Sequence, residues 1–236
     1  MKTALITGTS SGIGRATALA LLNEGYRVIG ISRTGAGIDN EFFSEILMDL
    51  SDTRLLCDTI SKLKSEYVFD VLINNAGVGF YGLHETLTAE QIHMITTINL
   101  EIPMLLCSRL MPQLKNVHGT IVNISSVTAK KTGNTHGAAY GATKAGLSSF
   151  SSSLFDEVRK HGVRVITIHP DMTDTGLYRN ADFTADRAEG CSLTAEAVAS
   201  AVVYAISQPD GINMEDITLT PQYHRIMRKN RGQKND

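Results

Sequence analysis

Short apolar runs alternate along the chain with longer segments of helical periodicity. The apolar runs are hydrophobic along their whole length rather than at every second position, which is typical of strands buried on both faces. The pattern therefore predicts a parallel sheet with helices on each side. We expect its strands at Thr3–Thr7, Tyr26–Ile31, Glu45–Met48, Asp70–Ile73, Thr120–Ile124, Val163–Ile168 and Ile217–Leu219.

Helical periodicity fills most of the segments between these strands. We expect helices at Gly14–Asn23, Asp52–Glu66, Ala89 to near Leu110, Tyr140–Lys160 and Ala195–Ile206. Pro103 predicts a kink in the third helix, because proline lacks a backbone donor. The longest irregular stretch, Asp171–Leu193, follows the sixth strand, and loops at that end of such sheets commonly carry function. Because we find no repeat and no linker, we interpret residues 1–236 as one domain.

The balance of charges argues against binding to nucleic acid or to anionic membranes. The 22 basic and 24 acidic residues leave a net charge of −2. One basic cluster lies at the C-terminus, where we expect a frayed, solvated end rather than a nucleic-acid tail. Its members are Arg225, Arg228, Lys229, Arg231 and Lys234.

Location and metal content are also suggested by the sequence. No apolar stretch approaches the roughly 20 residues of a membrane helix, and strand-like sequence from Thr3 leaves no room for a signal peptide. We therefore expect a cytoplasmic protein. Cys57, Cys107 and Cys191 are widely spaced, so we expect reduced thiols, with Cys107 in the core. The seven histidines lack metal-ligand spacing, and we expect no metal.

A glycine-rich turn links the first strand to the first helix. Gly8, Gly12 and Gly14 are spaced G-x-x-x-G-x-G, and Ser10 and Ser11 add hydroxyl donors. Such a spacing by itself is equally compatible with a turn that merely needs glycine. Its position after a strand and at the start of a helix favours a phosphate-binding turn, because the helix N-terminus offers unpaired N–H groups.

Further segments follow this turn in a recognisable order. They are Thr7–Gly14 with Arg15 and Ala16, Asp70–Gly77 (DVLINNAG), Asn99, Ser125–Ser126 and Tyr140–Lys144 (YGATK). With them, the chain resembles the short-chain dehydrogenase/reductase family over nearly its full length. The resemblance implies one α/β domain, a Rossmann-type doubly wound parallel sheet of about seven strands, and a homodimer or homotetramer. It also implies hydride transfer between a nicotinamide dinucleotide and a carbonyl or hydroxyl group of a small molecule.

Tyr140 and Lys144 are four residues apart on the fourth predicted helix and so share a face. An exposed polar face would explain this pair alone, but the small neighbours Gly141, Ala142 and Ala145 favour close packing. By resemblance, Tyr140 is the catalytic acid/base. Lys144 would favour its phenolate, because an adjacent cation lowers a phenol's pKa, and would also hold the nicotinamide ribose.

The resemblance gives roles to two other polar residues. Ser126 would hydrogen-bond the substrate oxygen, with Ser125 as the alternative, and either could be an ordinary strand-end hydroxyl. Asn99 would shape the proton path to the lysine, although a backbone-bonding amide is the simpler role. Thirteen residues separate Ser126 from Tyr140, one more than is usual in the family. The extra residue enlarges the loop Lys130–Gly137.

The resemblance also implies a set of cofactor-binding positions. Asp49 matches an aspartate near the adenine amino group, but it could equally cap the next helix, and Asn74 fits a tie between strands. Asp171 replaces the glycine of a P-G-x-x-x-T segment, which puts the backbone there in question; a turn explains it better than a substrate contact. The implied set is Gly8, Ser10, Ser11, Gly12, Ile13, Gly14, Arg33, Asp49, Leu50, Asn75, Ala76, Gly77, Tyr140, Lys144, Pro170, Asp171, Thr173 and Thr175.

The residues after the second strand favour NADP(H) over NAD(H). NAD-dependent Rossmann enzymes place a carboxylate there to accept hydrogen bonds from the ribose. This chain has the neutral Ser32 followed by Arg33, whose guanidinium can grip a 2′-phosphate. An ordinary surface arginine is the alternative for Arg33.

Two other functions compete with the dehydrogenase. A non-catalytic NADP-binding sensor or assembly subunit would have no need of Ser126, Asn99, Tyr140 and Lys144. A sugar-nucleotide epimerase would need a larger C-terminal substrate domain. The substrate itself is not identified: the 171–193 loop offers apolar walls, and Arg179 or Arg187 could bind a carboxylate. The apolar residues are Met172, Leu177, Tyr178 and Phe183.

Overall fold

Seven parallel strands form one sheet in the order β3-β2-β1-β4-β5-β6-β8 in the computed structural model, which describes residues 1–131 and 133–229. The prediction of a doubly wound parallel sheet is therefore confirmed. The strands are β1 (Thr3–Thr7), β2 (Arg27–Ser32), β3 (Phe43–Leu47), β4 (Val71–Asn74), β5 (Thr120–Ile124), β6 (Arg164–Pro170) and β8 (Asp216–Leu219).

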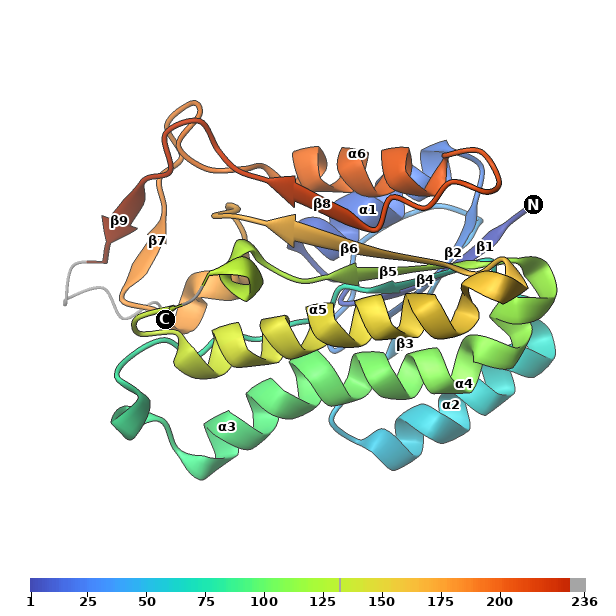
Figure 1. Ribbon diagram of the computed structural model, residues 1–236, viewed down its shortest axis with the longest axis horizontal. Coiled ribbons are helices and arrows are strands. Elements are labelled where there is room, and N and C mark those ends of the chain that lie inside the picture. Colours follow the sequence, from blue (N-terminus) through green and yellow to red (C-terminus); the bar gives the residue numbers. More distant parts are fainter. Residues whose placement is uncertain (132, 230–236) are drawn as a thin grey trace.

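Helices cover both faces of the sheet, as Figure 1 shows: α1 and α6 lie on one face, and α2, α4 and α5 on the other. Successive strand residues point to opposite faces, so each strand contributes to two apolar clusters. Leu5 packs in the cluster under α2 and α4, and its neighbour Ile6 packs under α1 and α6. These helices are α1 (Gly12–Asn23), α2 (Thr53–Glu66), α4 (Ile102–Val117), α5 (Ala138–Val158) and α6 (Ala195–Ile206).

The third predicted helix runs further than expected and contains a π-helical turn. It comprises α3 (Ala89–Thr96), a π-helical turn (Thr97–Glu101) and α4, so it ends at Val117 rather than near Leu110. Pro103 lies in the first turn of α4, where proline is tolerated, and the irregularity is the π turn before it. The structure therefore places the irregularity of this helix before Pro103 rather than at it.

This helical run is also long enough to cross a membrane. Ala89–Val117 spans 29 residues, and its most apolar window has a mean hydropathy of 1.2. The expectation that no stretch reaches that length was wrong. Half of that window is buried inside the protein, where Leu106 and Leu110 are fully covered. Such burial is that of a core helix.

The stretch Asp171–Leu193 is more ordered than its sequence predicts. It contains a 3₁₀ helix, η5 (Gly176–Asn180), and β7 (Phe183–Ala185), which pairs antiparallel with β9 (Ile226–Arg228). Lys229 also donates to the carbonyl oxygen of Tyr178 at 2.8 Å. The C-terminal segment up to Lys229 is thus paired with this loop rather than frayed. Arg231 and Lys234 of the basic cluster lie outside the described residues.

Candidate active site

A cavity opens at the carboxyl ends of the strands, next to β1 and β4, where the strand order reverses. Crevices at such switch points are the usual ligand sites of open α/β sheets. Of the residues expected at the site, Gly14 and Asn99 are not part of the wall. The expected residues that line it are Gly8, Ser10, Ser11, Gly12, Ile13, Arg33, Asp49, Leu50, Asn75, Ala76, Gly77, Ser126, Tyr140, Lys144, Pro170, Asp171, Thr173 and Thr175.

The glycine turn forms one end of the cavity, and its glycines are sterically required. Gly8 and Gly12 have φ of 77° and 55°, where glycine is favoured. A Cβ on Gly14 would lie 2.1 Å from the carbonyl oxygen of Gly8. The side chain of Ser11, the residue that precedes α1, makes no capping hydrogen bond, so the first N–H groups of α1 have no such partner. This arrangement suits an anionic group such as a phosphate.

Tyr140 and Lys144 meet near the other end of the cavity, both almost fully buried on α5. The Lys144 Nζ lies 5.9 Å from the centroid of the Tyr140 ring and donates to the carbonyl oxygen of Ile124 at 2.8 Å. Burial lowers the pKa of Lys144 to about 8. Burial also raises the pKa of Tyr140 to about 12, against the hydrogen-bonding influence of Ser126 and Tyr81. At neutral pH the phenol is consequently protonated and the lysine charged.

The two serines after β5 have different surroundings. Ser125 Oγ lies 3.0 Å from the carbonyl oxygen of Lys144 and 2.9 Å from Ser148 Oγ, so this hydroxyl is turned toward α5. Ser126 Oγ accepts the N–H of Thr128, and hydrogen bonding by its side chain favours a lower pKa of the Tyr140 phenol. Of the two hydroxyls, that of Ser126 is therefore the one that influences Tyr140.

Asn99 lies behind the cavity, in the π turn between α3 and α4. Its Oδ1 accepts the N–H of Val78 at 2.9 Å, and its Nδ2 donates to Val78 O and to Thr143 Oγ1. The side chain therefore ties the loop after β4 to α5. This is the simpler, backbone-bonding role that the sequence left open.

The structure supports different interpretations for Asn74 and Asp49. Asn74 Nδ2 donates to Asn123 Oδ1 at 2.8 Å, so it ties β4 to β5 as expected. Asp49 accepts the backbone N–H and hydroxyl of Ser51, and these hydrogen bonds lower its pKa, with a smaller effect from Arg33. The cap of α2 is Asp52. Asp49 thus remains at the rim of the cavity.

The residues after β2 form a braced loop. Ser32 is buried, and its hydroxyl lies 2.7 Å from the carbonyl oxygen of Thr34 and 2.9 Å from Glu45 Oε1. Glu45 also accepts the N–H of Ala36 at 2.8 Å. Arg33 is exposed and lines the cavity. Glu45 is a neighbour that the sequence did not indicate, because it comes from another strand.

Asp171 sits at the site without the backbone strain that the sequence raised. The non-glycine residues with positive φ in the described part of the chain are His118, His136 and His224, and Asp171 is not among them. Its Oδ1 accepts the N–H of Met172 at 2.8 Å, and its Oδ2 lies 3.1 Å from His224 Nδ1. The carboxylate stabilises a local turn and anchors the C-terminal segment.

The comparisons with known proteins agree with this geometry. The family described as short chain dehydrogenase matches residues 2–185. The chain belongs to the short-chain dehydrogenase family. Serine 3-dehydrogenase of Agrobacterium fabrum is 32% identical over 237 residues, covering 93% of each chain.

Two solved structures show how closely this short-chain dehydrogenase follows the fold. An alcohol dehydrogenase from Thermococcus sibiricus complexed with 5-hydroxy-NADP gives a TM-score of 0.84 at 24% identity, covering 95% of this chain and 98% of that one. A 3-ketoacyl-(acyl-carrier-protein) reductase from Brucella melitensis complexed with NADH gives 0.84 at 24% identity, covering 93% and 97%.

A cluster of aromatic rings packs beside Tyr140 in this short-chain dehydrogenase. The ring centroid of Tyr81 lies 5.5 Å from that of Tyr140 and 5.4 Å from that of Phe183, and Tyr178 lies 5.4 Å from Phe183. The sequence indicated Tyr178 and Phe183 but missed Tyr81. Tyr81 could have been indicated by its position in the loop that follows the DVLINNAG segment.

The two arginines of the 171–193 loop have different positions. Arg187 is exposed and pairs with Asp174 at 2.8 Å. Arg179 lines the cavity, as do Leu177 and Tyr178, whereas Met172 and Phe183, which were also expected there, do not. Of the two candidates for binding a substrate carboxylate, Arg179 is therefore the one at the cavity.

Proposed function

We propose that this short-chain dehydrogenase is an NADP-dependent oxidoreductase that transfers a hydride between NADP(H) and a carbonyl or secondary alcohol. The observation that carries the proposal is a single cavity with two ends. The glycine turn and the N-terminus of α1 form one end, and Ser126, Tyr140 and Lys144 form the other. A dinucleotide has its phosphates and its reactive ring apart in this way.

The residues present fit such a cofactor. The glycines leave room for a backbone approach, and the N–H groups at the start of α1 lack a side-chain cap. We assign the implied cofactor-binding residues to NADP(H), with Gly14 acting through the shape of the turn. When bound, the cofactor supplies or accepts the hydride.

The protein's own residues supply and remove the proton. In carbonyl reduction, the Tyr140 O–H donates its proton to the substrate oxygen while Ser126 hydrogen-bonds that oxygen. The Lys144 ammonium stabilises the phenolate that remains. A pKa of about 12 for Tyr140 keeps the phenol protonated in the unliganded protein, as a proton donor requires. Oxidation of an alcohol runs the same steps in reverse and needs the phenolate.

The preference for NADP(H) rests on Arg33. Structures of this fold contain an NADP derivative in one case and NADH in another, so the fold alone leaves the choice open. Arg33 is exposed at the cavity rim, and Ser32 presents no carboxylate there. A guanidinium forms paired, charge-assisted hydrogen bonds with a phosphate, which supports the NADP assignment.

The substrate is proposed only as a class. We expect a small carbonyl or hydroxy compound, a cytoplasmic enzyme and a homodimer or homotetramer. A substrate with a carboxylate would find Arg179 at the cavity, and the 32% identical serine 3-dehydrogenase makes small hydroxy acids a sensible first group to test.

A substrate panel tests the proposal. Purified protein is incubated with NADPH or NADH and a set of ketones, semialdehydes and hydroxy acids, and the absorbance of the reduced nicotinamide is followed. Turnover with NADPH that disappears in the Tyr140→Phe variant is the expected result. Tight NADPH binding without hydride exchange on any panel member would instead support the non-catalytic sensor or assembly subunit.

A further inference from the structure

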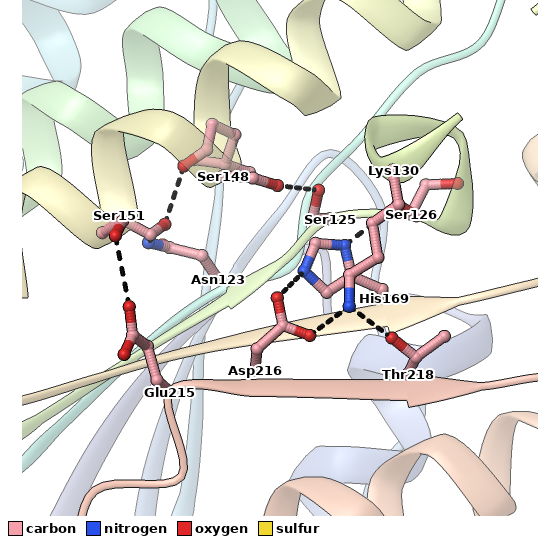
Figure 2. A network of polar contacts seen from close by, with 12 residues as sticks. Asn123, Ser125, Ser126, Lys130, Ser148, Ser151, His169, Glu215, Asp216 and Thr218 are labelled. Atoms are coloured by element: carbon pink, nitrogen blue, oxygen red, sulfur yellow. Dashed lines mark hydrogen bonds and ion pairs between the residues drawn. The ribbon is translucent and has the colours of Figure 1, made fainter. Parts of the chain in front are cut away.

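A buried histidine links the serine end of the cavity to the edge of the sheet. His169 lies on β6, directly before Pro170, and only 1% of its side chain is exposed. Its Nδ1 lies 3.0 Å from the carbonyl oxygen of Ser126. Its Nε2 lies 2.9 Å from Asp216 Oδ2 on the neighbouring strand β8. Figure 2 shows the ring between these two partners.

The partners of the ring constrain its protons. A carbonyl oxygen only accepts hydrogen bonds, so Nδ1 must be the donor to Ser126. The contact of Nε2 with Asp216 is close but poorly aligned for a hydrogen bond.

Asp216 also contacts the far end of the short helix that follows Ser126. Lys130, the last residue of η3 (Val127–Lys130), pairs with Asp216 and donates to Thr218 Oγ1 at 2.7 Å. Ser126 is the residue that caps this short helix. Both ends of the helix are therefore fastened to one carboxylate, through His169 at the start and through Lys130 at the end, as Figure 2 shows.

The carbonyl of Ser126 has a second donor, the N–H of Ala129 at 3.0 Å. Loss of the histidine contact therefore leaves no orphaned backbone group. The expected consequence is a shift in the position of Ser126 rather than unfolding. Ser126 influences the Tyr140 phenol, so a small shift would affect the reacting oxygen directly.

We propose that His169 and Asp216 are positioning residues that hold Ser126 in place for catalysis. This inference rests on the proposed function, in which the Ser126 hydroxyl binds the substrate oxygen. The charged neighbours of the ring are Asp216 on β8 and, beyond it, Lys130; Lys144 on α5 holds the adjacent strand through Ile124 O. Neither His169 nor Asp216 lines the cavity, so neither contacts substrate or cofactor.

Asp216→Asn is the main test, because the side chain is nearly half exposed and the change conserves its shape. We expect kcat to fall about tenfold, since misplacing a reacting group is costly, with NADPH affinity unchanged. Glu215→Gln is the matched control. Glu215 is the preceding residue and contacts Ser152 on α5 instead of His169, so its variant should keep kcat within about twofold of wild type.

A double-mutant cycle separates positioning from a general structural role. If Asp216 acts through Ser126, Asp216→Asn should cause no further loss in a Ser126→Ala background. Equal fractional losses in both backgrounds would overturn the inference, and so would full activity of Asp216→Asn. His169→Asn gives the same readout as a second variant.

The cycle also distinguishes this inference from the proposed function. An inactive wild type, or a Ser126→Ala variant as active as wild type, would refute the role of the serine itself. An impaired Ser126→Ala variant beside a fully active Asp216→Asn variant would refute only the positioning role.

Discussion

Lys144 illustrates at the scale of one residue how the site opposes stability. Its pKa falls from 10.5 to about 8 because burial disfavours the charged form. The unfolded chain therefore binds more protons between those values, and the stability of the protein should rise with pH across that window. Below it, the buried charge costs about 3 kcal/mol.

We predict that Lys144→Met abolishes activity but stabilises the unliganded protein. At neutral pH the gain should be about 2 kcal/mol, because losing the hydrogen bond to Ile124 O offsets about 1 kcal/mol of the relieved cost. The gain should vanish above the ordinary pKa of lysine. Urea unfolding at neutral and high pH measures it, with the exposed Lys160→Met as control. A destabilised Lys144→Met protein with retained activity would contradict both parts.

Arg33 is expected to determine the preference for NADPH. Arg33→Ile should weaken NADPH binding ten- to a hundredfold, since hydrogen bonds to charged groups contribute roughly 1.5–3 kcal/mol, and should change NADH binding far less. Calorimetry at fixed ionic strength gives both affinities, and Arg159→Ile, at the exposed residue just after α5, controls for net charge. Equal losses for the two cofactors would argue that Arg33 is an ordinary surface residue.

Reversing the preference needs more than one change. Ser32 lies 2.9 Å from the Glu45 carboxylate, so Ser32→Asp alone would put two carboxylates together. Adding Glu45→Gln to Ser32→Asp and Arg33→Ile should remove that repulsion and move the preference towards NAD.

At the scale of elements, backbone hydrogen bonds tie the 171–193 loop to its neighbours near its start, and η5 lies along the cavity. Asp171 N donates to Leu219 O and Asp174 N to Leu193 O, whereas η5 follows with its residues along the cavity. We predict that amide exchange in residues 175–180 slows when NADPH and substrate bind. The β7–β9 ribbon should change less and serves as the internal reference. Unchanged exchange across 175–180 would show that the loop does not order on binding.

The elements also show which features the sequence could reveal. All seven strands of the main sheet were predicted, and the five inner ones stood out because buried parallel strands are apolar throughout. The β7–β9 ribbon was not visible, since Ile226–Arg228 is exposed and its three residues pair only with an equally short strand. The π turn before Pro103 was missed because its residues continue a helical pattern, and its purpose, placing Asn99, depends on tertiary contacts.

Some residues of the site could likewise be predicted from the sequence, and others could not. Residues marked by type and spacing, such as Gly14, Tyr140 and Lys144, were found from the sequence. Partners brought in by the sheet were not, because nothing local distinguishes them: Glu45 meets Ser32 across β3 and β2, and Asp216 meets His169 across β8 and β6.

For the whole molecule, the strand order explains why these parts meet. The connections after β1 and β4 leave in opposite directions, and the crevice between them joins the glycine turn to the serine, tyrosine and lysine at the ends of β5 and α5. We propose that this crevice performs hydride transfer with Tyr140 as the proton donor.

Single-turnover transfer from deuterium-labelled NADPH to a substrate identified in the panel tests that claim most directly, in wild type and in Tyr140→Phe. The phenyl ring preserves packing against Tyr81 but has no proton to give. We expect transfer in the wild type and at least a hundredfold slower transfer in the variant, with NADPH affinity within a few-fold of wild type. Comparable transfer rates in the two proteins would show that Tyr140 is not the proton donor.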